Sequence, residues 1–243
     1  MAKRGKVKHL AIRDTEERVI KRRKYPHLFL IVCEDENTEP YYFSKFKEEF
    51  DKISGETVFL RFVGTGRSSK GVVEQAIIKK QELFEEANKT VDEVWAVFDK
   101  DDANKSDGNR QRFSDAFEVA KENAIKVAYS NEVFELWLLL HFVDIDSNTP
   151  ISRQDIYSRL ETNINKGRTD ATQIRYNHKR VDTDIIDLIL NSGNENEAIK
   201  RAKHLDNEHK KKGTQPIDAN PNTKVYSLVE QLRELQSWYS RIP

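Results

Sequence analysis

Three acidic residues follow a short apolar run in the middle of the chain. The run 94–98 is rich in β-branched and aromatic residues and too short for a helix, so it predicts a buried strand. Asp99, Asp101 and Asp102 come directly after it. If the strand geometry persists, Asp99 and Asp101 point the same way and repel each other unless a cation or a proton lies between them. Mg²⁺ or Mn²⁺ with oxygen ligands is the natural occupant, and a plain polar strand exit is the alternative.

A second acidic strand end lies upstream. The run 28–33 is apolar throughout and predicts a fully buried strand, and Glu34 follows it directly. Glu39 stands at the start of the next predicted helix, 40–50, where an ordinary first-turn acid is favoured by the helix dipole. Glu34 has no such explanation, so it is the stronger candidate for chemistry.

A third acid lies in the run 133–142, which is apolar on all sides and predicts a buried helix. A lone buried carboxylate is costly, so Glu135 must bind a metal ion or pair with a basic side chain. His141, in the same run, is interpreted as a core histidine. If the preceding strands are parallel neighbours, the acids all meet at the carboxyl edge of one sheet, where ligands collect in α/β folds.

The remaining elements alternate between strands and helices, which is typical of an α/β fold. Asp107-Gly108 predicts a turn in a polar loop before the helix 112–123. The other predicted elements of this half are a strand at 58–63, a helix at 72–88 and a strand at 126–129.

From residue 150 onward the sequence changes to helices separated by polar segments. The last helix has apolar residues at helical spacing, so it should pack back on the body, with a turn and N-cap at 220–223. The predicted helices of this half are 153–160, 182–190, 195–212 and 223–239. Together these patterns divide the chain into a basic arm (1–24), an α/β catalytic core (25–149) and a helical, basic region packing on the core (150–243).

Several cations are candidates for contacts with a nucleic-acid backbone. Arg67 and Lys70 lie in a Gly- and Ser-containing loop before a helix, which is either an ordinary flexible loop or a phosphate contact. Lys179 and Arg180 belong to the cation-rich second half, where solvated helix faces explain many of the charges. The arm either binds phosphates or solubilises the protein.

The composition excludes several classes of protein. Of the 243 residues 34% are charged, 37% are hydrophobic and the net charge is zero, so no global field favours nucleic acid. The single cysteine, Cys33, excludes an internal disulfide and a cysteine-rich zinc site. No apolar segment is long enough to span a bilayer, so we expect a cytoplasmic protein without a membrane partner.

Several stretches resemble RloB-like proteins. They are 31–43, 97–102, 130–142 and the Asn-Pro-Asn-Thr at 220–223. The resemblance implies a Toprim-like (Rossmann-type) domain, with a mostly parallel sheet and flanking helices, and a role in prokaryotic defence against phage. Related Toprim nucleases of the OLD (overcoming lysogenisation defect) type bind metal ions through a conserved acidic set, which motif by motif corresponds here to Glu34, Glu39, Asp99, Asp101 and Glu135. Asp35 stands where the family usually has Gly, which predicts a different turn or an added ligand.

The expected function is metal-dependent hydrolysis of RNA, including tRNA, or of DNA during abortive infection. Mg²⁺ or Mn²⁺ would be held by Glu34, Asp99 and Asp101. The alternatives are a non-catalytic nucleic-acid- or protein-binding partner of a defence ATPase, and a metal-dependent phosphatase, which would leave Glu34 unexplained. Besides nucleic acid, an ATPase or another defence-system subunit is the expected partner.

Overall fold

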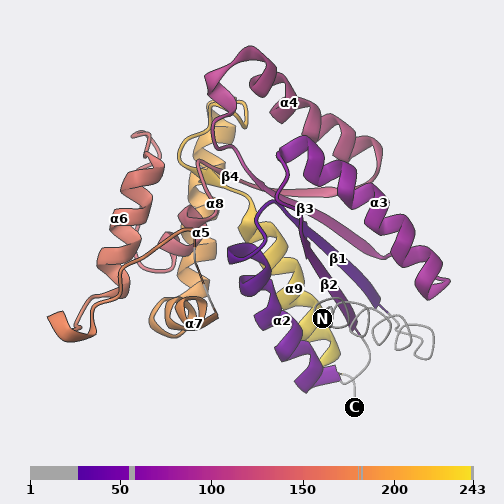
Figure 1. Ribbon diagram of the computed structural model, residues 1–243, viewed down its shortest axis with the longest axis horizontal. Coiled ribbons are helices and arrows are strands. Elements are labelled where there is room, and N and C mark those ends of the chain that lie inside the picture. The colour runs from indigo at the N-terminus through magenta and orange to yellow at the C-terminus, as the bar shows by residue number, and fades with distance from the viewer. Residues whose placement is uncertain (1–26, 55–57, 180, 182, 242–243) are drawn as a thin grey trace, which may run out of the picture.

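A computed structural model gives the fold of residues 27–54, 58–179, 181 and 183–241. Within these ranges five strands form one sheet in the order β2-β1-β3-β4-β5 (Figure 1). The first four are parallel neighbours, and β5 pairs antiparallel with β4. The predicted arm, 1–24, lies outside the described residues.

The described elements alternate between strands and helices in the first half of the chain and are mostly helical in the second. The strands are β1 (His27–Cys33), β2 (Val58–Gly64), β3 (Glu93–Asp99), β4 (Lys126–Asn131) and β5 (Asn222–Thr223). The helices are α2 (Thr38–Ser54), α3 (Ser69–Ala87), α4 (Asp107–Glu122), α5 (Glu135–Leu140), α6 (Arg153–Ile164), α7 (Thr183–Ser192), α8 (Glu195–Lys211) and α9 (Val225–Tyr239). Two short 3₁₀ turns, η1 (Ala103–Lys105) and η2 (Asp170–Thr172), complete them. The fold is therefore Rossmann-like α/β with a mostly parallel sheet and flanking helices, which confirms the predicted fold class.

The central strands β1 and β3 are buried on both faces, which is why they read as continuous apolar runs. Along β1, Phe29 and Ile31 face one apolar cluster, whereas Leu28 and Leu30 face the other. Helices α3 and α4 cover the second face, and α2 and α9 cover the first (Figure 1). The helices α5 to α8 lie on the same side of the sheet as α2 and α9 and place their own side chains in the same cluster.

The first apolar cluster extends across the predicted boundary at residue 150. On α9, Leu228 and Leu232 are fully buried, and the helix packs against β4 and α2. Residues on both sides of position 150 contribute to this one cluster. The division into 25–149 and 150–243 stays a prediction. In the described part of the chain, helices with the length and apolar character needed to cross a bilayer are absent.

Two predicted boundaries in the first half are wrong. Asp107-Gly108 is the first turn of α4 rather than a loop turn, because the Ser106 hydroxyl accepts a hydrogen bond from the Asn109 amide and caps the helix there. The predicted helix at 133–142 is helical only over α5, although all six residues of α5 are buried. At the start of α4, the cap formed by the Ser106 hydroxyl outweighed the turn propensity of the Asp107-Gly108 pair.

The segment before α9 also differs from the prediction. Asn222 and Thr223 form the short strand β5, and the residue at the N-cap is Lys224. The Thr223 hydroxyl lies 3.0 Å from that of Ser130 on β4. A two-residue strand has no periodicity that a sequence can display, so its partner on β4 determines it.

The packing of Phe98 gives a test of the layer formed by α4. Phe98 is fully buried, and its ring makes edge contacts with Phe113 and Phe117 of α4 at centroid distances of 5.8 and 5.6 Å. We expect Phe98→Ala to lower the free energy of unfolding by ~3–5 kcal/mol, measured by urea denaturation, because it removes a buried ring and leaves a cavity. The control is Phe84→Ala on α3, whose side chain is 43% exposed and which should cost much less. Equal losses for the two variants would contradict the assigned core.

Candidate functional site

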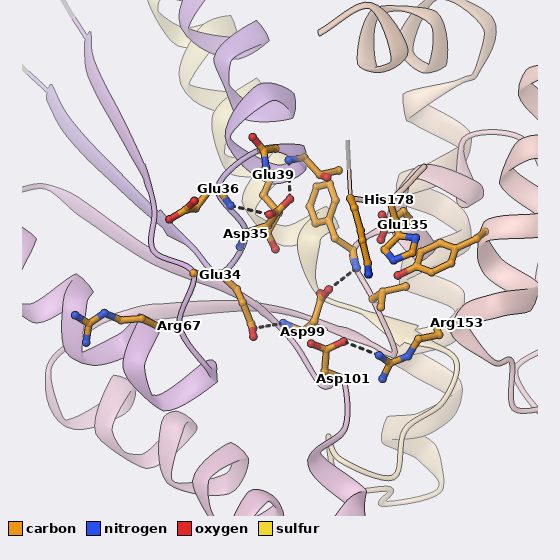
Figure 2. Close-up of a pocket in the computed structure, with 17 residues that line it drawn as sticks. Glu34, Asp35, Glu36, Glu39, Arg67, Asp99, Asp101, Glu135, Arg153 and His178 are labelled. Carbon is orange, nitrogen blue, oxygen red and sulfur yellow. Dashed lines mark hydrogen bonds and ion pairs between the residues drawn. The ribbon is translucent and has the colours of Figure 1, made fainter. Parts of the chain in front are cut away.

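A cleft of about 490 Å³ opens at the carboxyl ends of β1 and β3 (Figure 2). The structure brings all the acids of the predicted catalytic set to this one cleft. They are Glu34 after β1, Glu39 in the first turn of α2, Asp99 and Asp101 at and after the end of β3, and Glu135 at the start of α5. Residues from four elements therefore converge at the sheet edge where the sequence placed them.

Glu34 joins the ends of two neighbouring strands. Its carboxylate Oε2 accepts a hydrogen bond from the Asp99 amide at 3.0 Å, and its own amide donates to the carbonyl of Val97 at 2.9 Å. The turn after β1 passes so close to β2 that a Cβ on Gly64 would lie 2.6 Å from the Asp35 carbonyl oxygen. Only glycine fits there, so Gly64 allows this turn to hold Glu34 against β3.

Asp35, which stands where glycine was expected, shapes the start of α2. Its Oδ1 accepts from the amide of Glu36 at 2.7 Å and its Oδ2 from that of Thr38 at 2.8 Å. Its own amide donates to Glu39 Oε2 at 2.9 Å, so the buried Glu39 carboxylate has a backbone partner. Asp35 thus holds the turn after β1 and the start of the helix that carries Glu39, and a difference from the turn of a glycine-containing relative stays a prediction.

The two aspartates after β3 lie in different environments. Asp99 Oδ2 accepts from the amide of Phe134 at 2.9 Å, and its Oδ1 is buried without a hydrogen-bond partner. Asp101 has a φ of +46° and a half-exposed side chain. The expectation that strand geometry continues to Asp101 is therefore wrong, since β3 ends at Asp99, although Asp101 still lines the cleft. Lys100 between them points elsewhere and pairs with Glu132.

Glu135 is buried and has a partner that the sequence did not indicate. Its Oε1 accepts a hydrogen bond from the hydroxyl of Tyr176 at 2.8 Å. The prediction offered a metal ion or a basic side chain, but the observed partner is a neutral hydroxyl. His141, by contrast, is a buried core residue as expected, with Nδ1 3.0 Å from the carbonyl of Trp137.

Burial and mutual repulsion favour the protonated form of these acids. Burial, together with the charges of Asp101 and Asp35, raises the pKa of Glu34 to about 8. Burial raises the pKa of Glu135 to about 7, although the Tyr176 hydrogen bond opposes the shift. For Glu39 and Asp99, burial and the charges of neighbouring acids hold the pKa well above the ordinary range. The cleft is thus an environment that favours added positive charge.

The donor set fits a hard divalent cation in its chemistry. All the donors are carboxylate oxygens, and the buried Asp99 Oδ1 lacks a partner. Among residues 27–54, 58–179, 181 and 183–241, no group of three or more His, Cys, Asp or Glu side chains has the geometry to hold a metal ion as it stands. Glu34, Asp99 and Asp101 are the residues that would hold such an ion.

The predicted nucleic-acid contacts are only partly brought together. Arg67 and Lys179 line the acidic cleft. Lys70 does not line it and pairs instead with Asp115 of α4 at 3.0 Å. Arg180 lies outside the described residues.

Three further residues of the cleft were not predicted as site residues: Arg153, Tyr157 and His178. The guanidinium of Arg153 lies 2.8 Å from Asp102 and 3.4 Å from Asp101, so it is a cation beside the acidic set. Arg153 and Tyr157 are one turn apart on α6, a spacing that is visible in the sequence. Nothing in the sequence showed that this face turns toward the acids.

The fold and the cleft define a Rossmann-like α/β protein with an acidic site at the carboxyl edge of a parallel sheet. The family model described as RloB-like protein matches residues 29–232. The chain therefore belongs to the RloB-like protein family, which confirms the resemblance seen in the sequence motifs. Comparisons with curated proteins and with solved structures find no match.

The raised pKa values predict how stability depends on pH in metal-free protein. An unfolded glutamate ionises near 4.5, whereas folded Glu135 and Glu34 stay protonated up to about pH 7 and pH 8. The folded state therefore binds more protons, so the free energy of unfolding should fall as pH rises from about 4.5 to about 8. The total loss should be on the order of a few kcal/mol, measured by urea denaturation in chelator.

Glu34→Gln provides the matched comparison, because glutamine is neutral at every pH. We expect this variant to show a shallower fall in stability than the wild type over the same interval. Glu36→Gln, at an exposed carboxylate of the same turn, should leave the slope as it is. A wild-type stability that rises over this interval would contradict the described burial of the acids.

Proposed function

We propose that this protein is a metal-dependent nuclease that hydrolyses phosphodiester bonds of RNA, including tRNA, or of DNA. One observation carries the proposal: Glu34, Asp99 and Asp101, together with Glu39 and Glu135, line a single cleft although they come from separate elements. Membership of the RloB-like family supports a role in prokaryotic defence against phage. An ATPase or another defence subunit is the protein partner we propose.

The chain's own residues would bind the substrate and balance its charge. Glu34, Asp99 and Asp101 would hold Mg²⁺ or Mn²⁺, which when bound supplies a Lewis acid for the phosphate and lowers the pKa of a bound water. Arg67 and Lys179 line the same cleft and would contact phosphate oxygens of the strand. Arg153 neutralises part of the negative charge of Asp101 and Asp102.

The cleft also limits how the substrate can approach. Glu39 is buried and Asp99 has one buried carboxylate oxygen, whereas the side chain of Asp101 is half exposed. A phosphate would therefore meet the exposed Asp101 first, in a cleft that Arg153 and Lys179 also line. This arrangement favours a backbone laid across the carboxyl edge of the sheet.

Cleavage assays test the activity directly. Labelled tRNA, single-stranded RNA and plasmid DNA are incubated with the protein in Mg²⁺, Mn²⁺ or chelator. We expect metal-dependent cleavage of one substrate class, and a loss of ~100-fold or more in Asp99→Asn and Glu34→Gln, because each removes a negatively charged oxygen ligand. Glu234→Gln, an identical charge change on an exposed residue of α9, is the control and should cleave normally. Undiminished cleavage by the Asp99→Asn variant would contradict the assignment of Asp99 to the site.

Metal binding can be measured apart from cleavage. We expect Mn²⁺ titrated by calorimetry to bind the wild type and to bind Asp99→Asn much more weakly. At a free metal concentration 100-fold above the dissociation constant, the wild type should gain about 2.7 kcal/mol of stability. If the wild type gains no stability from Mg²⁺ or Mn²⁺ and shows no binding heat, these carboxylates do not form a metal site.

A further inference from the structure

One wall of the acidic cleft is aromatic. Tyr157 of α6 and His178 stack with their ring planes 4° apart and their centroids 4.5 Å apart. Both line the cleft that the acids line. In Figure 2, His178 and Arg153 lie on one side of the drawn pocket, with Glu34 and Arg67 on the other. A parallel pair of rings at the border of a polar cleft offers an apolar surface to whatever enters it.

The imidazole of His178 has one covered face and one open face. Tyr157 lies against one face, and the residue as a whole is exposed, so the other face is open toward solvent and the cleft. Partial burial and the charges of Lys179 and Arg153 lower the pKa of His178, which keeps the ring neutral near neutral pH. A neutral ring of this kind binds by stacking, whereas the neighbouring Lys179 binds by charge.

The aromatic pair is also connected to the acids. Behind Tyr157 lies the ring of Tyr176, at a centroid distance of 6.1 Å, and the Tyr176 hydroxyl donates to Glu135. After burial, the charges of Glu135 and Asp99 are the largest causes that raise the pKa of Tyr157, so its hydroxyl lies within their electrostatic reach. The aromatic pair therefore lies beside acids that line the same cleft.

We infer that Tyr157 and His178 form a stacking platform for an unpaired nucleobase, so that the cleft binds single-stranded or locally unpaired nucleic acid. This inference rests on the proposed function and names the form of its substrate. Bases inside a duplex are covered on both faces by their neighbours, so only an unpaired base presents a face to a side chain. Stacking also supplies attraction that does not depend on charge, which an acidic cleft needs in order to hold a polyanion.

Equilibrium binding tests the platform without relying on cleavage. Fluorescence anisotropy is measured with labelled oligouridylate, oligothymidylate and duplexes of the same length, using the full chain in Ca²⁺ and in chelator over a range of salt concentrations. We expect single strands to bind more tightly than duplexes. His178→Ala should weaken single-strand binding roughly 5- to 150-fold, which is the usual loss of affinity when the side chain that stacks on one base is removed. His178→Phe, which keeps an aromatic face, should restore most of the affinity.

The salt dependence separates stacking from charge. His178→Ala should lower the affinity by the same factor at every salt concentration. Lys179→Ala, next to it in the chain, should instead reduce the slope of log affinity against log salt by about one. The comparison of oligouridylate with oligothymidylate shows which of the two nucleic acids the platform prefers.

Three results would overturn the inference. They are equal binding of duplex and single strand, unchanged single-strand affinity in His178→Ala, and a lack of binding by every oligonucleotide. Because binding is the readout, single-strand affinity that depends on His178 supports the platform even if cleavage is absent. In that case the nuclease proposal fails and the binding inference stands.

Discussion

Glu34, Glu39 and Asp99 line one cleft and are largely removed from solvent, and a carboxylate in such surroundings is costly unless it has partners. Each receives one backbone hydrogen bond, from the amides of Asp99, Asp35 and Phe134 respectively. The amides of Asp35 and Asp99 are free to do so because they lie where strands β1 and β3 end, and that of Phe134 is free because it lies at the N-terminus of α5. The carboxyl edge of the parallel sheet thus gathers the acids and also satisfies part of their hydrogen-bonding capacity, and the positions of the surrounding turns follow from this requirement.

The sheet could be predicted well because its strands carry their signal locally. The runs that became β1 and β3 are apolar and β-branched, and both faces of the sheet are buried, so each run differs sharply from the amphipathic helices beside it. Strand β5 could not be predicted, since its two residues are defined by pairing with β4. The start of α4 depended on the single hydroxyl of Ser106, which competed with an Asp-Gly turn signal.

The acids of the site could be located from the sequence because each follows a strand or begins a helix. Their surroundings could not. The backbone at Asp101 turns into the left-handed region, which no residue type in the stretch required. Tyr176 reaches Glu135 from a segment without helical or strand periodicity, and His178 lies in the same segment. Contacts of this kind depend on how α6 and the chain after it pack on α5, which sequence spacing does not encode.

The packing of α9 has a consequence for how the protein is made. Its Leu228 and Leu232 lie in the same apolar cluster as Phe29 and Ile31, at the opposite end of the chain. A ribosome-bound chain that has emerged only as far as α8 has β1 to β4 but cannot yet cover this face of the sheet with α9. The part of the apolar surface that α9 covers therefore stays exposed until this helix leaves the exit tunnel, and shorter nascent chains are candidates for chaperone binding.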